Sequence, residues 1–85
     1  EENRRRILEA LFQQPMDFTS LRDVTGLSEP TLSRHIHHLL QPRFVEVKNK
    51  GKRRVYEITE KGLEELYPYL LGVNSALRAM KNEDI

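Results

Sequence analysis

Hydrophobic side chains near the start of the chain repeat with the period of an α-helix. Over residues 3–14 they fall on one helical face. We expect this helix to end before Pro15, because the residue ahead of a proline is pushed away from the α region. The residues predicted to form its buried face are Ile7, Leu8, Leu11 and Phe12.

Two further helices with a tight turn between them are predicted over residues 19–40. Thr19 or Ser20 is the candidate N-cap of the first, and Gly26 ends it as a left-handed C-terminal residue. Ser28 is the candidate N-cap of the second, with Pro30 in its first turn. The buried stripe predicted for this second helix consists of Leu32, Ile36 and Leu39.

Beyond residue 43 the hydrophobic period changes from that of a helix to that of a strand. Residues 44–58 hold two alternating runs separated by Asn-Lys-Gly-Lys, which predicts a β-hairpin with a basic tip. A helical spacing returns over residues 60–81, with Thr59 as its candidate N-cap. The hydrophobic phase continues past Pro68, so we expect a kinked helix or two in-line pieces.

These elements predict a mainly α fold with a small β-hairpin, an α+β arrangement. The chain has 85 residues, which is the size of one domain, so a single domain over residues 1–85 is expected. The chain has no cysteine, which excludes disulfides, thiolate zinc sites and cysteine nucleophiles. No hydrophobic run approaches the roughly 18 residues of a membrane span, and we therefore expect a cytoplasmic protein with no membrane partner.

The net charge of +1 conceals an uneven distribution along the sequence. Residues 28–54 hold seven Lys or Arg and two Asp or Glu, a net charge of +5. Residues 1–27 and 55–85 have net charges of −1 and −3. The basic segment coincides with the third predicted helix and the hairpin, which favours an anionic partner at that place.

Three segments between Phe18 and Gly62 together resemble known regulators. Gly-Leu-Ser at 26–28 with Thr-Leu-Ser-Arg-His at 31–35 is similar to the turn and recognition helix of ArsR-type repressors. Arg-Arg-Val-Tyr-Glu-Ile-Thr-Glu-Lys-Gly at 53–62 is similar to the second wing strand and following helix start, and residues 49–52 lie where the wing tip falls. The order resembles winged helix-turn-helix transcription regulators of the ArsR, MarR and PadR type, and this resemblance implies DNA binding.

The sequence departs from these families at two points. Residues 42–45 read Pro-Arg-Phe-Val where the families usually have a Gly-Leu-Val step, so the entry into the first wing strand is expected to differ. The cysteine-based metal motif of the metal-sensing members is absent, so an arsenic or cadmium sensor of that kind is not expected.

The candidate DNA contacts are hydroxyl, guanidinium, imidazole and ammonium groups on the third helix and the hairpin. Such groups bind base edges in the major groove or backbone phosphates. A solvated helix face and a charged hairpin edge that discourages strand pairing are the alternative interpretations. The predicted DNA-binding residues are Ser28, Thr31, Ser33, Arg34, His37, Lys50, Lys52, Arg53 and Arg54.

Other polar clusters give weaker signals. His35, His37 and His38 lack the i, i+4 spacing of helical metal ligands, so no metal or other cofactor is predicted. For Arg4–Arg6 we favour a solvated face balanced by nearby glutamates over phosphate contact. No set of nucleophile, base and orienting group is visible, and an enzyme is not expected.

The last predicted helix has more hydrophobic surface than one small domain can cover, which favours a homodimer. The alternative is a helix that lies wholly across its own domain. We therefore interpret the chain as a homodimeric, sequence-specific regulator of double-stranded DNA, a prokaryotic and nucleoid-associated repressor with no evident small-molecule effector. A protein-assembly module and an RNA-binding module are the alternative functions. The predicted dimer contacts are Leu66, Tyr69, Leu70, Val73, Leu77 and Met80.

Overall fold

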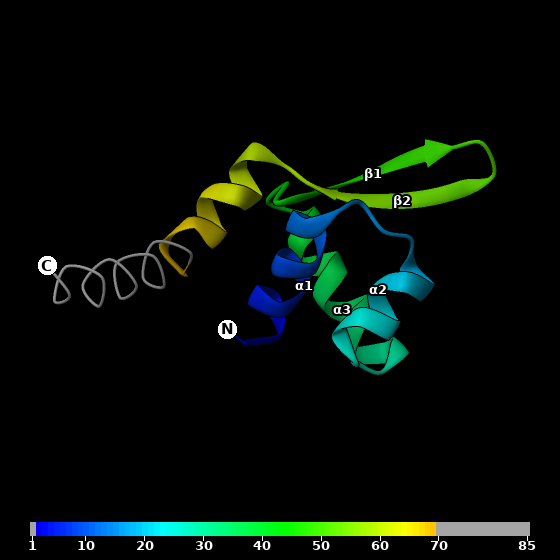
Figure 1. The fold of residues 1–85 in the computed structure, drawn as a ribbon, viewed down its shortest axis with the longest axis horizontal. Helices are drawn as coiled ribbons and strands as arrows, with labels where there is room; N and C mark the ends of the chain where they lie inside the picture. Colours follow the sequence, from blue (N-terminus) through cyan, green and yellow to red (C-terminus); the bar gives the residue numbers. More distant parts are fainter. Residues whose placement is uncertain (1, 70–85) are drawn as a thin grey trace, which may run out of the picture.

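The computed structural model describes residues 2–69, and Figure 1 shows their arrangement. Three helices come first: α1 (Glu2–Gln13), α2 (Phe18–Thr25) and α3 (Glu29–Leu40). The antiparallel strands β1 (Val45–Lys50) and β2 (Arg53–Ile58) follow, and residues 60–69 are helical. The mainly α fold with one hairpin is thus confirmed in the described residues, and the hairpin projects beyond α2 and α3 (Figure 1).

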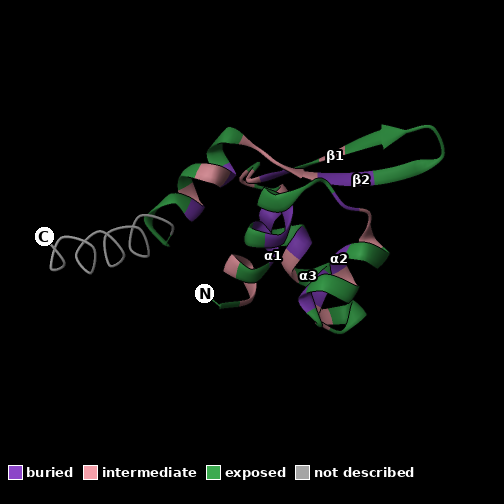
Figure 2. Cartoon of the chain, in the orientation of Figure 1, coloured by how far each residue is buried: buried purple, intermediate pink, exposed green. Residues whose placement is uncertain are grey.

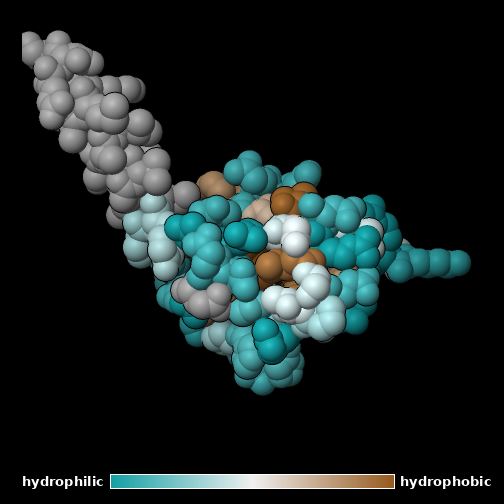
Figure 3. Space-filling view, turned by 90° about the horizontal axis from the view of Figure 1, so that it is seen from below, coloured by the Kyte–Doolittle hydropathy of each residue, from teal (hydrophilic) through white to brown (hydrophobic). Residues whose placement is uncertain are grey.

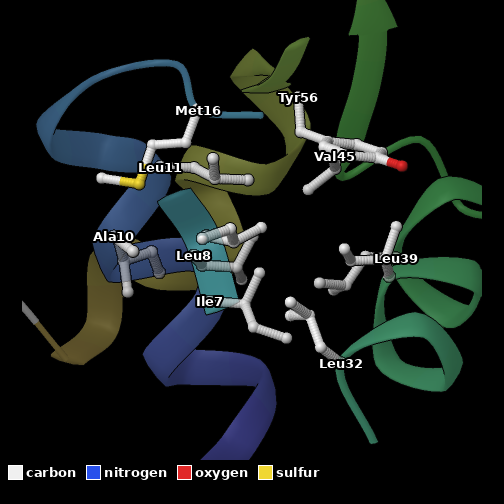
Figure 4. Packing of buried hydrophobic residues seen from close by; sticks show 12 residues of the cluster. Ile7, Leu8, Ala10, Leu11, Met16, Leu32, Leu39, Val45 and Tyr56 are labelled. Carbon is white, nitrogen blue, oxygen red and sulfur yellow. The ribbon is translucent and has the colours of Figure 1, made fainter. Parts of the chain in front are cut away.

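The hydrophobic core lies where α1, α3 and the root of the hairpin meet (Figure 4). Ile7, Leu21 and Leu32 have no exposed surface, and Leu39 and Val45 have about as little. The predicted inward stripes of α1 and α3 are confirmed, apart from Phe12, which is 46% exposed. Figure 2 shows the consequence: burial is concentrated at the root of the hairpin, and its tip is exposed.

In the helix-turn-helix formed by α2 and α3, the turn follows the prediction and the start of α2 departs from it. Gly26 adopts a left-handed conformation with φ of 71°, and Ser28 accepts a hydrogen bond from the backbone N–H of Thr31. The N-cap of α2 is Asp17, rather than Thr19 or Ser20 as predicted, and its carboxylate accepts from the backbone N–H of Ser20. Aspartate is among the strongest N-caps, so the helix begins earlier than the hydroxyl residues suggested.

The step from α3 into β1 turns at Arg43. Arg43 has a positive φ of 62°, a region that glycine adopts without cost. Its N–H bonds to the carbonyl of Leu40, and the N–H of Phe44 bonds to the carbonyl of Leu39. This is a Schellman ending in which arginine occupies the position usually taken by glycine.

The hairpin spans residues 45–58, within the predicted 44–58, its strands pair further towards the tip than predicted, and its root carries an additional backbone pairing. Lys50 pairs with Arg53, which leaves only Gly51 and Lys52 in the turn, with φ of 66° at Gly51. Met16 pairs with Tyr56 through two backbone hydrogen bonds of 3.1 and 2.8 Å. The connector between α1 and α2 thereby pairs with the edge of β2 that β1 leaves free.

Residues 60–69 are helical and begin as predicted. The Thr59 hydroxyl accepts from the N–H of Gly62 and donates to the carbonyl of Arg43 at 2.6 Å. A Cβ on Gly62 would collide with the carbonyl oxygen of Phe44, so a glycine is needed at this crossing. The helix includes Pro68, and whether it kinks further on lies outside the described residues.

One predicted dimer contact is a core residue instead. Leu66 has no exposed surface and belongs to the chain's own hydrophobic cluster, so its side chain does not face a second copy. Tyr69 is 43% exposed and remains accessible. The other predicted contacts, Leu70, Val73, Leu77 and Met80, lie outside the described residues.

Candidate nucleic-acid interface

The outward face of α3 carries the predicted base-reading groups. Ser33, Arg34 and His37 are exposed, because Leu32, Ile36 and Leu39 hold the opposite face in the core. The guanidinium of Arg34 has no hydrogen bond or ion pair with another side chain among residues 2–69. An unpaired guanidinium on an exposed helix face has all its donors available to a partner.

The other predicted groups on α3 have internal contacts. The Ser28 hydroxyl donates to Thr31 Oγ1 at 2.9 Å while it caps the helix, so its first role is structural. The Nε2 atom of His37 lies 3.1 Å from the side-chain nitrogen of Gln41. Thr31 is half-buried, which leaves Ser33 and Arg34 as the least constrained groups of the predicted set.

The register of the hairpin divides its basic residues between two faces. Lys48, Lys50 and Arg53 share one face, since Lys50 lies opposite Arg53, and Arg54 lies on the other face opposite Asn49. Lys48 is bound to Glu57 at 2.8 Å, and Arg53 is bound to Asp17 at 2.6 Å. In the part of the chain that the structure describes, Lys50, Lys52 and Arg54 have no ion pair.

The two ion pairs of the hairpin shift the pKa values of their members. Hydrogen bonds from Ser20, and then from Arg53, lower the pKa of Asp17 from 3.8 to about 2. The hydrogen bond from Lys48 lowers the pKa of Glu57, and the same bond raises the pKa of Lys48. Both carboxylates are therefore ionised at neutral pH and hold their cations.

The N-terminal arginines lie elsewhere and are engaged within the fold. Arg4 pairs with Glu65 at 3.2 Å, and its guanidinium lies 5.9 Å from the centre of the Phe44 ring. Arg5 pairs with Glu2 at 2.9 Å, and Arg6 lies 3.8 Å from the same carboxylate. The two Glu2 contacts fit the balanced helix face that the sequence favoured, and the Arg4–Glu65 pair joins α1 to the last helix.

The hairpin tip forms a hydrophilic extension of the molecule, at the right in Figure 3. The same view shows a small hydrophobic patch in the middle of a mostly hydrophilic face. No group of His, Cys, Asp or Glu suited to a metal ion occurs among the described residues. No helix within residues 2–69 is long and apolar enough to cross a membrane.

Sequence comparison identifies one family. The model of the bacterial regulatory proteins of the arsR family matches residues 1–47, which is more than half of the chain. That span covers the three helices α1, α2 and α3 and the start of β1. No curated protein sequence matches the chain.

Solved structures show the same fold. A homodimeric winged helix-turn-helix DNA-binding domain from Mycobacterium bovis is 24% identical, with a TM-score of 0.71 over 88% of this chain and 69% of that one. The transcriptional repressor BigR from Xylella fastidiosa is 23% identical, with a TM-score of 0.75 over 91% and 76%. The adhesin competence repressor from Streptococcus pyogenes is 16% identical, with a TM-score of 0.78 over 96% and 63%.

Proposed function

Since this chain belongs to the ArsR family of bacterial regulatory proteins, we propose that it binds specific sequences in double-stranded DNA as a homodimeric repressor. In this proposal α3 enters the major groove, and the tip of the hairpin binds the adjacent backbone or minor groove. Arg34 reads a base edge, with Ser33, Thr31 and His37 beside it. Lys50, Lys52 and Arg54 neutralise phosphates.

The observation that supports this proposal is the pattern of unpaired cations. Arg34 on α3 and the three cations Lys50, Lys52 and Arg54 on the hairpin have no ion pair in the described part of the chain. On the rest of the described surface Arg4, Arg5, Arg6 and Arg22 are paired with carboxylates, and Arg43 and Lys61 are two further cations without an ion pair. Most of the unpaired charge thus lies on the two elements that a winged helix presents to DNA.

The homodimer and the repressor role rest on different support. The similar domain from Mycobacterium bovis is described as homodimeric, and BigR is described as a transcriptional repressor. Tyr67 and Tyr69 on the last described helix are 53% and 43% exposed, and the Tyr69 ring also lies 5.4 Å from the guanidinium of Arg5. Two copies related by a two-fold axis would place their recognition helices in half-sites about 34 Å apart.

The decisive experiment is selection of bound duplexes from a random pool by the purified protein. A palindrome with half-sites about one helical turn apart would support specific binding and the dimer together. Enrichment of no sequence would reject specific DNA recognition. A single, non-repeated half-site would reject the dimer alone.

The role of Arg34 is tested on the selected duplex. Arg34→Ala should weaken binding by about 1–3 kcal/mol and relax the preference at one base pair, because a bidentate guanidinium contact is lost. Lys61→Ala is a matched control that removes one exposed cation from the last helix. If Arg34→Ala weakened the specific and random duplexes equally, Arg34 would not read a base.

A further inference from the structure

The hairpin is attached to the body of the molecule at two successive places on β2. Nearer the root, Met16 pairs with Tyr56 through backbone hydrogen bonds. Three residues nearer the tip, Arg53 binds Asp17, the residue that follows Met16, at 2.6 Å. Past this pair the tip is exposed and has no further ion pair to the body among residues 2–69.

Asp17 connects two elements because each carboxylate oxygen has its own partner. Oδ1 accepts from the backbone N–H of Ser20 at 2.8 Å and thereby caps α2. Oδ2 accepts from Arg53 of β2 at 2.6 Å. The side chain of Asp17 is 28% exposed, so the pair is partly shielded from solvent.

This connection bears on DNA binding because α2 also fixes the recognition helix. The left-handed turn at Gly26 links α2 to α3, and Arg22 of α2 binds Glu29 of α3 at 2.7 Å. A hydrogen-bonded carboxylate that holds β2 against α2 therefore restricts where the hairpin tip lies relative to α3. Two contact surfaces bind one duplex best when their relative position is set beforehand.

We infer that the Asp17–Arg53 pair is a latch that sets the position of the wing relative to the recognition helix. Arg53 is then a positioning residue that stays bound to Asp17, in place of the phosphate contact that its charge suggested. The inference rests on the proposed DNA-binding function. It divides the basic residues of the wing into those that bind DNA and one that holds the wing in place.

The first test compares DNA binding of Asp17→Asn, Arg53→Gln and the double variant across a range of salt concentrations. Asparagine caps helices as well as aspartate, so Asp17→Asn removes the ion pair and retains the cap. Each single variant should bind the selected duplex about fivefold more weakly, and the double variant should be no weaker, because all three lose one shared interaction. Arg54→Gln is the matched control, an unpaired neighbour on the opposite face.

The salt dependence separates a latch from a phosphate contact. Arg54→Gln should lower the slope of log K against log salt by ~0.9, and Arg53→Gln should leave it nearly unchanged. Removal of a negative charge ordinarily strengthens binding to DNA. Weaker binding by Asp17→Asn would therefore be the opposite of what the change in charge alone predicts. Stronger binding by Asp17→Asn, with a slope lowered by ~0.9 in Arg53→Gln, would overturn the latch.

A second measurement needs no DNA. The chain has no cysteine, so two spin labels can be attached specifically at Ser33→Cys and Lys52→Cys. The labelled protein is diluted with unlabelled protein, so that only distances within one copy are measured. The distance distribution between α3 and the hairpin tip should broaden when Asp17→Asn or Arg53→Gln is added, and should keep its width with Arg54→Gln. If the distance distribution kept its width in Asp17→Asn and Arg53→Gln, the inference would be rejected even if the protein binds DNA. If the distribution broadened, the latch would be supported even if the protein did not bind DNA.

Discussion

The two arginine-rich regions of this chain differ in what surrounds them. In the run Arg4–Arg6 every guanidinium lies near a carboxylate, from Glu2 on the same helix or Glu65 on the last one. On α3 and at the hairpin tip, Arg34, Lys50, Lys52 and Arg54 have no such partner in the described residues. Both regions hold three consecutive cations, Arg4–Arg6 and Lys52–Arg54, and yet only in the first does every one of the three lie near a carboxylate.

The two regions differ because the spacing of acidic residues around their cations differs. A helix brings residues three and four positions apart together, so Glu2 and Glu9 neutralise the run from within α1. A two-residue turn leaves the hairpin tip without acidic neighbours, and its register pairs Lys50 with Arg53 across the strands. Like charges placed opposite each other destabilise a hairpin, and the carboxylate of Asp17 offsets this repulsion.

The largest effect is expected from removing the unpaired cations of the hairpin together. Changing Lys50, Lys52 and Arg54 to Gln should lower the salt slope of DNA binding by ~2.7, which corresponds to roughly 100-fold weaker binding at 0.15 M salt. The free energy of unfolding should change little, since the three side chains are exposed. Salt titration and urea denaturation measure the two quantities.

The matched control for this triple variant is Arg4, Arg5 and Arg6 changed to Gln. It also removes three cations, and it should leave the salt slope within about half a unit of the wild-type value. If the two triple variants lowered the slope equally, the contrast between paired and unpaired cations would have no bearing on DNA binding.

A smaller effect, on stability, is expected from Arg4 alone. Arg4→Ala removes a half-exposed ion pair with Glu65 and a contact with the Phe44 ring, and should lower the free energy of unfolding by about 1 kcal/mol. Glu65→Gln, which loses only the ion pair, should cost less. Urea denaturation checks both, and a loss of DNA affinity at unchanged stability would instead assign Arg4 to the interface.

Much of this fold could be predicted because its signals are local. Helical periodicity placed α1 and α3, Gly26 and Ser28 marked the turn, and alternation marked the hairpin. Asp17 was missed as the N-cap because two hydroxyl residues stood close behind it. An aspartate three residues before Ser20 was a signal that could have identified it.

The remaining errors concern contacts between residues far apart in the sequence. The ion pair of Arg53 with Asp17 and the pairing of Met16 with Tyr56 depend on the path of the connector after α1. Periodicity placed Leu66 on a hydrophobic face but did not indicate whether its own core or a second copy covers it, and the core does. Whether a cation has a carboxylate partner thus depends on the tertiary structure. The sequence therefore identified the basic residues of the wing but could not show which of them are paired with carboxylates.

The smallest effect is expected from titrating the carboxylate of the latch. The pKa of Asp17 is lowered from 3.8 to about 2 in the folded chain, so the stability that it contributes is fully present above about pH 4 and is lost as the pH falls towards 2. Asp17→Asn should therefore be less stable than the wild type at pH 7, and the difference should vanish near pH 2. Arg53→Gln should retain most of this pH dependence, because the hydrogen bonds from Ser20 are the larger cause of the lowered pKa. Urea denaturation between pH 2 and 7 measures all three proteins, and a constant difference between Asp17→Asn and wild type over that range would show that Ser20 and Arg53 together bind the carboxylate no better than an amide.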